Sequence, residues 1–322
     1  MNTEASNIEK KKEKRSEMIR KLGPFFALIV LMVFVTILNP NFIQMGNILN
    51  LLRQVSINGL IAFGMTFVII TGGIDLSVGS TLALSGALGA GLIAGGWSPV
   101  LATLAALVIG ALLGAVNGTL IAKGKTAPFI ATLATMTIYR GLTLVYTDGN
   151  PISGIGDSFF FQFIGKGYLF GIPFPVILMA IAFGILYVIL HKMTFGRKTF
   201  AIGGNENAAY IAGIKSDWIK IAVYSISGLM ASLAGLILTS RLNSAQPTAG
   251  TTYELDAIAA VVLGGTSLSG GRGRLFGTLV GALIIGTLNN GLNLIGVSSF
   301  YQQVVKGIVI IIAVLLDRKS DK

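Results

Sequence analysis

The chain has 322 residues, of which 53% are hydrophobic and only 11% are charged. Soluble globular domains carry about 25% charged residues, so this composition excludes an ordinary soluble domain. There is no cysteine and only one histidine, His191, which excludes a disulfide framework, a thiolate nucleophile and a Cys- or His-rich metal site. Apolar runs long enough to cross a ~30 Å hydrocarbon core recur along most of the chain. We therefore expect an all-α polytopic membrane protein without a cofactor.

The formal net charge of +11 does not indicate nucleic-acid binding, because of where the cations lie. Seven of the 24 Lys and Arg residues precede residue 22, in a tail (residues 1–21) without apolar periodicity. Most of the others fall in short gaps between apolar runs. Cations placed between spans are a topology signal, so we expect a lipid bilayer and no nucleic acid as the environment of this chain.

Hydropathy predicts ten transmembrane helices within one membrane domain, residues 22–316. The first run is expected to be a retained span and not a signal peptide, because Asn39-Pro40-Asn41 stands where a cleavage site of small residues would be needed. Eight spans remain an alternative if the short eighth segment and a neighbour are re-entrant. The expected spans are 22–38, 54–71, 76–95, 99–122, 128–146, 172–190, 218–240, 254–268, 275–294 and 300–316.

The distribution of cations predicts the orientation. If the N-terminus is inside, 19 of the 24 cations fall in cytoplasmic segments, including the C-terminal tail, residues 317–322. The other five lie outside or near the outer ends of spans, and they are Arg53, Arg140, Lys166, Arg241 and Lys306. By the positive-inside rule, both termini are expected to be cytoplasmic.

Small residues recur at helical spacing, and short motifs recur along the chain. Gly110, Gly114 and Gly118 form a GxxxGxxxG row, and Gly277 and Gly281 repeat the spacing, which predicts close helix packing. Residues 72–79 and 264–271 both read GGxxLSxG, and residues 114–117 and 286–289 both read GxxN. These matches are consistent with an internal duplication. The expected topology puts both glycine turns on the cytoplasmic side, which favours a parallel repeat and leaves its symmetry open.

The chain shows no nucleotide-binding motif of its own. Gly124-Lys125-Thr126 invites comparison with a P-loop, but the required first glycine is Thr119, and the preceding segment is a span and not a strand. We therefore expect a transport protein and not an enzyme. Any uphill transport must draw its energy from a partner or from an ion gradient.

The cytoplasmic loop at residues 203–214 predicts a short helix that docks on another protein. Asn205 can cap this helix, Glu206 lies in its first turn, and Gly213 suits its C-terminal end. A loop helix that lies on the membrane surface is the alternative. The small side chains expected to face the cytoplasm, without a partner in the chain, are Ala208, Ala209, Ile211 and Ala212.

This loop resembles the coupling helix of ABC-transporter permeases. The segments GGIDLSVGS (72–80), GGNE (203–206) and VVLGGTSLSGGRG (261–273) make the whole stretch from residue 22 to residue 316 similar to the bacterial ribose-type sugar permeases. The residues matching the coupling helix are Asn205, Glu206, Ala208, Ala209, Gly213 and Ile214.

The resemblance implies a multi-pass permease of the bacterial plasma membrane that works as a homodimer. A cytoplasmic ABC ATPase, with two nucleotide-binding domains fused in one chain, would drive it. An extracytoplasmic sugar-binding protein would deliver the substrate, and D-ribose is the expected sugar.

Polar groups within or beside the spans are candidates for a sugar path or a gate, with interhelical bonding as the alternative. Asp75 either caps the following helix or acts in gating. The other candidates are Asn58, Thr71, Ser77, Asn117, Asn289, Asn290 and Asn293. An outer charge cluster of Arg140, Glu254, Asp256 and Lys306 is expected to serve as a latch, as a docking site or in proton coupling.

Two other function classes remain open at this level. An ion-coupled secondary transporter of a small polar solute would use Asp75 or the Glu254/Asp256 pair as its coupling group. A membrane scaffold without transport activity would leave the polar residues within spans unexplained.

Overall fold

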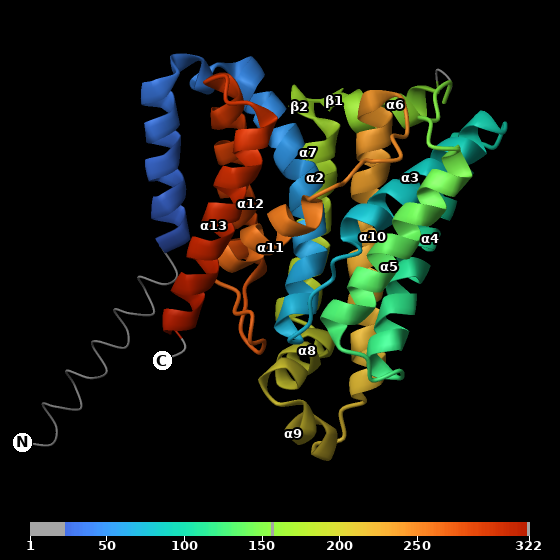
Figure 1. Cartoon of the computed structure of the whole chain (residues 1–322), viewed down its shortest axis with the longest axis vertical. Coiled ribbons are helices and arrows are strands. Elements are labelled where there is room, and N and C mark those ends of the chain that lie inside the picture. The colour runs from blue at the N-terminus through green and yellow to red at the C-terminus, as the bar shows by residue number, and fades with distance from the viewer. Residues whose placement is uncertain (1–22, 156–157, 321–322) are drawn as a thin grey trace, which may run out of the picture.

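The computed structural model describes residues 23–155 and 158–320, and the expected basic tail (residues 1–21) lies outside this part of the chain. The described chain is a bundle of helices with a single two-stranded hairpin (Figure 1). The helices long and apolar enough to cross a membrane are α2 (Met45–Ile70), α4 (Pro99–Ala122), α5 (Pro128–Thr147), α7 (Phe174–His191), α10 (Ser216–Leu242) and α12 (Leu275–Leu294).

Three shorter apolar helices complete most of the bundle. They are Gly23–Leu38, α3 (Val78–Ala94) and the Ser299–Leu315 part of α13 (Ser299–Ser320). Helices α4 and α12 begin and end where hydropathy predicts, whereas α2 begins nine residues before the expected start at residue 54. The all-α polytopic membrane fold is therefore confirmed.

Short elements mark the two ends of the bundle. At one end, which we call the α9 end, lie α8 (Thr194–Gly204) and α9 (Glu206–Ile211) (Figure 1). The opposite end, which we call the hairpin end, carries the 3₁₀ turn η1 (Pro40–Ile43) and α6 (Phe159–Lys166). It also carries the antiparallel pair of strands β1 (Tyr168–Leu169) and β2 (Ile172–Pro173).

Two long helices are each followed by a non-helical segment that turns back into the bundle and leads into a short helix. We call each such unit a helical hairpin. After α2, residues 71–77 return toward the middle of the bundle before α3 begins, and after α10, residues 243–252 return in the same way before α11 (Tyr253–Leu263) (Figure 1). Helices α2 and α10 are antiparallel, since Gly64 contacts Ser227 while Gly73, further along α2's chain, contacts Tyr224. The two helical hairpins therefore point in opposite directions.

The opposite directions of these helical hairpins bear on the sense of the internal repeat. Both GGxxLSxG turns do lie at the α9 end, since the Gly271 amide donates to the Ile70 carbonyl at 2.9 Å. However, the first turn precedes α3, whereas the second joins α11 to α12, so the two occupy different places in the fold. The GxxN matches do lie on equivalent helices, α4 and α12, which run in opposite directions (Figure 1). These opposite directions favour an inverted over a parallel arrangement of the two halves, a question that the sequence leaves open.

Close helix contacts account for the rows of small residues. On α4, Gly110 and Gly114 face Gly228 and Tyr224 of α10, and Gly118 faces Ile221. In the second half, Gly277 of α12 lies against Gly264, which follows α11 directly. Without a hydrophobic force between helices in lipid, such close backbone approach supplies much of the packing. The predicted packing role of these glycines is confirmed.

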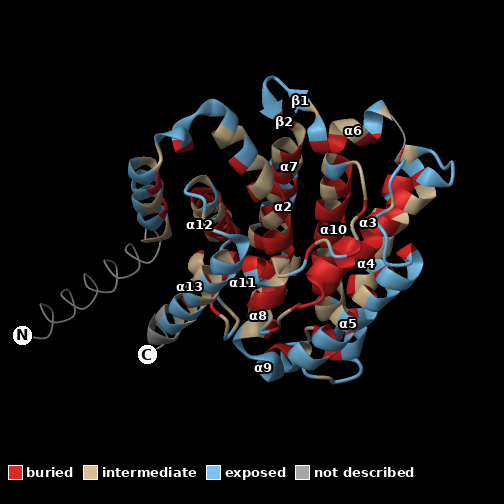
Figure 2. Ribbon diagram, turned by 45° about the horizontal axis from the view of Figure 1, so that its top comes forward, coloured by how far each residue is buried: buried red, intermediate tan, exposed pale blue. Residues whose placement is uncertain are grey.

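Buried side chains concentrate on α2, α3 and α10, which form the centre of the bundle (Figure 2). Helices α4, α5, α7 and α13 surround this centre, and their outer faces carry exposed apolar side chains such as Leu104, Val145 and Ile311 (Figure 2). Apolar side chains that face outward match the lipid surroundings expected of a membrane protein.

We expect Gly114→Ala to weaken the contact between α4 and α10. The added Cβ would overlap the Tyr224 carbonyl oxygen, and overpacking costs about 1–3 kcal/mol. Gly184→Ala is the matched control, because a Cβ there meets no atom within 4 Å. The midpoint of thermal unfolding in detergent should fall for the first variant and not for the second. Equal midpoints would contradict the packing analysis.

Candidate functional site

A polar cavity of about 630 Å³ lies among α2, α10, α11, α12 and α13. Its wall includes Gln54 and Asn58 from the middle of α2, Arg241 from the end of α10, and Asn293 from the end of α12. These positions place the cavity in the half of the bundle next to the hairpin end (Figure 1). The loop between α10 and α11 closes one side with Gln246. Small-molecule sites usually measure about 300–1,000 Å³, so the cavity is large enough for a small solute.

An ion pair joins two helices across this cavity. Lys306 of α13 places its Nζ atom 2.8 Å from Oδ2 of Asp256, which lies in the first turn of α11. The Asp256 side chain is 3% exposed and that of Lys306 is 21% exposed. A buried carboxylate without a partner would be costly, so the pair allows a charge to lie next to the cavity.

Three of the five candidate asparagines line the cavity, and Asn117 and Asn290 do not. Asn58, Asn289 and Asn293 are part of its wall. Asn290, although adjacent to Asn289, exchanges two amide hydrogen bonds of 2.9 Å with Asn47. The helical rotation of 100° per residue separates the two neighbours onto different faces.

A second polar cluster surrounds Asp75, in the segment before α3. The hydroxyls of Ser77 and Ser227 donate to its two carboxylate oxygens at 2.7 and 2.9 Å, and the Ser77 amide donates at 3.0 Å. Asn117 donates to the Ser77 hydroxyl at 2.7 Å. Asp75 is only 1% exposed, and one hydroxyl partner, Ser77, belongs to the same segment while the other, Ser227, belongs to α10, so the cluster ties residues 71–77 to α10.

The remaining candidates lie apart from both clusters. Arg140 donates to the carbonyls of Pro247 and Ala249 at 2.6 and 2.8 Å, which braces the loop before α11. Glu254 lies against Gly79 at the start of α3. Asp256 and Lys306 form an ion pair, Arg140 lies close enough to Glu254 for their charges to interact, and Glu254 in turn feels the charge of Asp256.

Helix α9 has the local structure that its sequence predicts. The Asn205 side chain accepts a hydrogen bond from the Ala208 amide at 3.0 Å, and Glu206 lies in the first turn. At the other end, Gly213 has φ +81°, its amide donates to Tyr210, and the Ile214 amide donates to Ala209. This pair of bonds is a Schellman ending, which favours glycine.

The exposed surface of α9 differs from the expected one at a single position. Ala209 is 4% exposed and faces the protein, so its expected place on the outer surface is wrong. Ala208, Ile211 and Ala212 are exposed as expected, Ile211 at 85%, and Tyr210 is exposed as well, at 75%. The physical reason is that α9 packs on α8 and α10, which occupy one of its faces.

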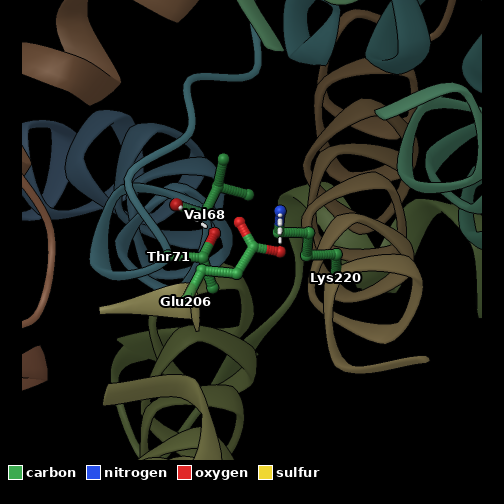
Figure 3. Close-up of polar contacts among 4 residues, drawn as sticks. All are labelled: Val68, Thr71, Glu206 and Lys220. Atoms are coloured by element: carbon green, nitrogen blue, oxygen red, sulfur yellow. Dashed lines mark hydrogen bonds and ion pairs between the residues drawn. The ribbon is translucent and has the colours of Figure 1, made fainter. Parts of the chain in front are cut away.

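An ion pair attaches the start of α9 to the bundle. Glu206 Oε1 lies 2.6 Å from Nζ of Lys220 in α10 (Figure 3). Thr71, which directly follows α2, donates its hydroxyl to the Val68 carbonyl at 2.7 Å (Figure 3). Thr71 therefore lies at the α9 end and not at the cavity, although it is a candidate for the path.

Several residues of these sites escape prediction from sequence. Ser227, the α10 partner of Asp75, is visible in the sequence only as part of a row of small residues. Tyr253, Arg241 and Gln246 line the cavity. Only Arg241 carries a signal, as a cation at the end of an apolar run, because Gln246 and Tyr253 both fall between the expected spans 218–240 and 254–268.

Removing the Asp75 carboxylate should destabilise the bundle. Asp75→Ala leaves one buried amide and two hydroxyls without their acceptor, and each stranded donor costs about 1–3 kcal/mol. Asp75→Asn keeps one acceptor oxygen and should lower the midpoint of thermal unfolding less. Asp217→Ala, at an exposed aspartate, is the control. The analysis fails if Asp75→Ala and Asp217→Ala unfold at the same temperature.

Comparison with known proteins identifies the family to which the chain belongs. A family model described as "Branched-chain amino acid transport system / permease component" matches residues 47–314. The chain is 68% identical over 320 residues to the ribose import permease protein RbsC of Bacillus subtilis strain 168, with 99% of each chain covered. It is 54% identical over 296 residues to the ribose import permease protein RbsC of Escherichia coli K12, covering 91% of this chain and 92% of that one.

A further relative is named after a different sugar. The D-allose transport system permease protein AlsC of Escherichia coli K12 is 43% identical over 304 residues, which cover 94% of this chain and 93% of the relative. No solved structure matches the chain. Because the family model spans most of the chain and the relatives align over more than nine-tenths of it, the chain belongs to this family of transport-system permease components.

Proposed function

We propose that the chain is the membrane-spanning permease subunit of an ABC importer for D-ribose in the bacterial plasma membrane. The observation that carries this proposal is the 68% identity to a ribose import permease over 99% of both chains. The polar cavity between the helices supports it, because a neutral sugar needs donors and acceptors along its path. An ion-coupled secondary transporter is not favoured, because the family consists of permease components of transport systems.

Three partners complete the proposed importer. A cytoplasmic ABC ATPase, with two nucleotide-binding domains in one chain, supplies the energy that this chain lacks a motif to provide. A sugar-binding protein delivers ribose from outside, and a second copy of the chain completes a homodimer. Asn58, Asn289 and Asn293 are the proposed contacts of the sugar path, whereas Asp75, Ser77, Asn117, Asn290 and Thr71 are proposed to control helix position around it.

Reconstitution tests the transport function. Proteoliposomes that contain the chain, the ATPase and the binding protein should accumulate radiolabelled ribose only with ATP, and leaving out either partner should abolish uptake. Native mass spectrometry of the same complex should find two permease chains. ATP-independent, pH-driven uptake by the permease alone would instead support the ion-coupled alternative.

We place both termini and the α9 end in the cytoplasm, with ten transmembrane helices. The support is the 19 of 24 cations that would then lie inside. The count includes α3 and α11, which are too short to cross a bilayer unless the interrupted segments before them complete the crossing.

Cysteine labelling tests this orientation on a chain that contains no cysteine. An impermeant thiol reagent added to intact cells should label Asn150→Cys, in the exposed turn after α5, and should not label Asn205→Cys before α9. After the cells are opened, both should react. Labelling of Asn205→Cys in intact cells would reverse the proposed orientation.

Helix α9 is the proposed contact with the ATPase, through Asn205, Glu206, Ala208, Gly213 and Ile214 together with the exposed Tyr210 and Ile211. Its buried Ala209 holds the helix against the bundle and does not take part directly. The Glu206–Lys220 ion pair supports this role, since it joins α9 to α10, whose other end forms a wall of the cavity.

Ile211→Arg should leave folding intact and impair coupling. The side chain is 85% exposed, so arginine fits without overpacking, but it would introduce a charge at an apolar contact. We expect the variant to lose its ATPase on purification, or to retain it without producing uptake. Asn150→Arg, at the opposite end of the bundle, is the control. Normal ATP-driven uptake by the Ile211→Arg variant would contradict the proposed role of α9 as the contact with the ATPase.

A further inference from the structure

The cavity contains charged groups, which a path for a neutral sugar does not require. Asp256 and Lys306 both line it, and they belong to helices that are far apart in the sequence, α11 and α13. Their separation of 2.8 Å makes the pair neutral as a unit. The cavity therefore presents strong hydrogen-bonding groups without a net charge from this pair.

The pair retains hydrogen-bonding capacity. A lysine ammonium has three N–H groups, and the bond to Asp256 Oδ2 uses one of them. Hydrogen bonds to ionised groups are roughly twice as strong as bonds between neutral groups. An ammonium that donates next to a carboxylate that accepts can bind two neighbouring hydroxyls of one molecule, each of which is both a donor and an acceptor.

A neighbouring side chain supplies an acceptor without a partner. Asn289 of α12 lies beside the Asp256 carboxylate, and its Oδ1 atom is buried without a hydrogen bond. A buried acceptor that is left unpaired costs free energy until a donor reaches it. Asn289 lines the cavity, and its amide must turn so that Oδ1 faces the cavity before a hydroxyl of a bound molecule can donate to it, because the atom is buried as the side chain stands.

The cavity also offers an apolar surface beside these groups. Tyr253, three residues before Asp256, contributes to the same wall, and an aromatic ring is a side chain on which the C–H groups of a solute can pack. The cavity thus combines charged hydrogen-bonding groups, an amide and an aromatic residue. Such a combination suits a small ring-shaped molecule that carries both hydroxyl groups and C–H groups.

We propose that Asp256, Lys306 and Asn289 form a polyol-recognition site within the cavity, which binds vicinal hydroxyls of the neutral sugar on its way through the permease. The inference rests on the proposed function and goes further by assigning the recognition to an ion pair between α11 and α13. The pair is thus more than a latch between the two helices. It determines which solutes can occupy the cavity.

Protection of a cysteine by sugar tests the site. The parental protein is the assembled importer, without ATP, carrying Gln246→Cys as its only permease cysteine. Gln246 lines the cavity outside the proposed recognition groups. A small cationic methanethiosulfonate should label this cysteine several-fold more slowly in concentrated D-ribose than in glycine betaine of equal osmolarity, which carries no hydroxyl. Labelling of Asn150→Cys, outside the cavity, should not change.

The same measurement on variants separates recognition from a structural latch. In Asp256→Asn/Lys306→Gln, which removes both charges together, protection by ribose should disappear. Asn289→Ala keeps the ion pair and should weaken protection, whereas Asn290→Ala, whose side chain faces Asn47, should retain it. The Asn289 and Asn290 variants decide the question if the double variant does not insert.

The outcomes distinguish this inference from the proposed function. If the parental importer takes up ribose with ATP but ribose gives no protection, the recognition site is wrong and the function stands. If protection is equal in the parental, the double and the Asn289→Ala proteins, the pair is only a latch. If the parental importer does not take up ribose, the proposed function itself is wrong.

Discussion

The architecture depends on two interruptions of helical backbone inside a membrane bundle. Irregular backbone is tolerated at membrane depth only where it is buried in protein or lines a cavity, because lipid offers no hydrogen bonds. The segment before α3 meets the first condition through Asp75, Ser77 and Ser227. The segment before α11 meets the second, since its residues form one wall of the cavity. Gly250 of the second segment and Gly79 in the first turn of α3 approach so closely that a side chain at either position would separate them.

The two halves have related but unequal polar centres. In the first half, Asn117 of α4 reaches the Asp75 cluster, which is closed on all sides. In the second half, Asn289 of α12 lies beside Asp256, which opens onto the cavity. Each half therefore combines an amide with a carboxylate. In the first half the combination stabilises the segment before α3, and in the second half it lies at the cavity, where a ligand can bind. The difference lies in Lys306, which gives the second carboxylate a cation.

The long helix α10 connects the places where the proposed function acts. Its first turns hold α9 through Lys220, its middle holds Asp75 through Ser227, and its end contributes Arg241 to the cavity. Its contacts with α4 occur at glycines, so it is packed closely along much of its length. A rigid element with these contacts can transmit a displacement of α9 toward the cavity.

The sequence alone determined the features that depend on local composition. Long apolar runs fix α4 and α12 because hydropathy is a property of consecutive residues, and Asn205 and Gly213 fix the ends of α9 because capping uses neighbours in the chain. Only the tertiary structure decided which polar residues meet. Asn289 and Asn290 are equivalent in composition but face different helices. Asp256 and Lys306 are 50 residues apart, and Ala209 is buried by neighbouring helices. Such contacts depend on how helices pack against one another, which no local pattern encodes.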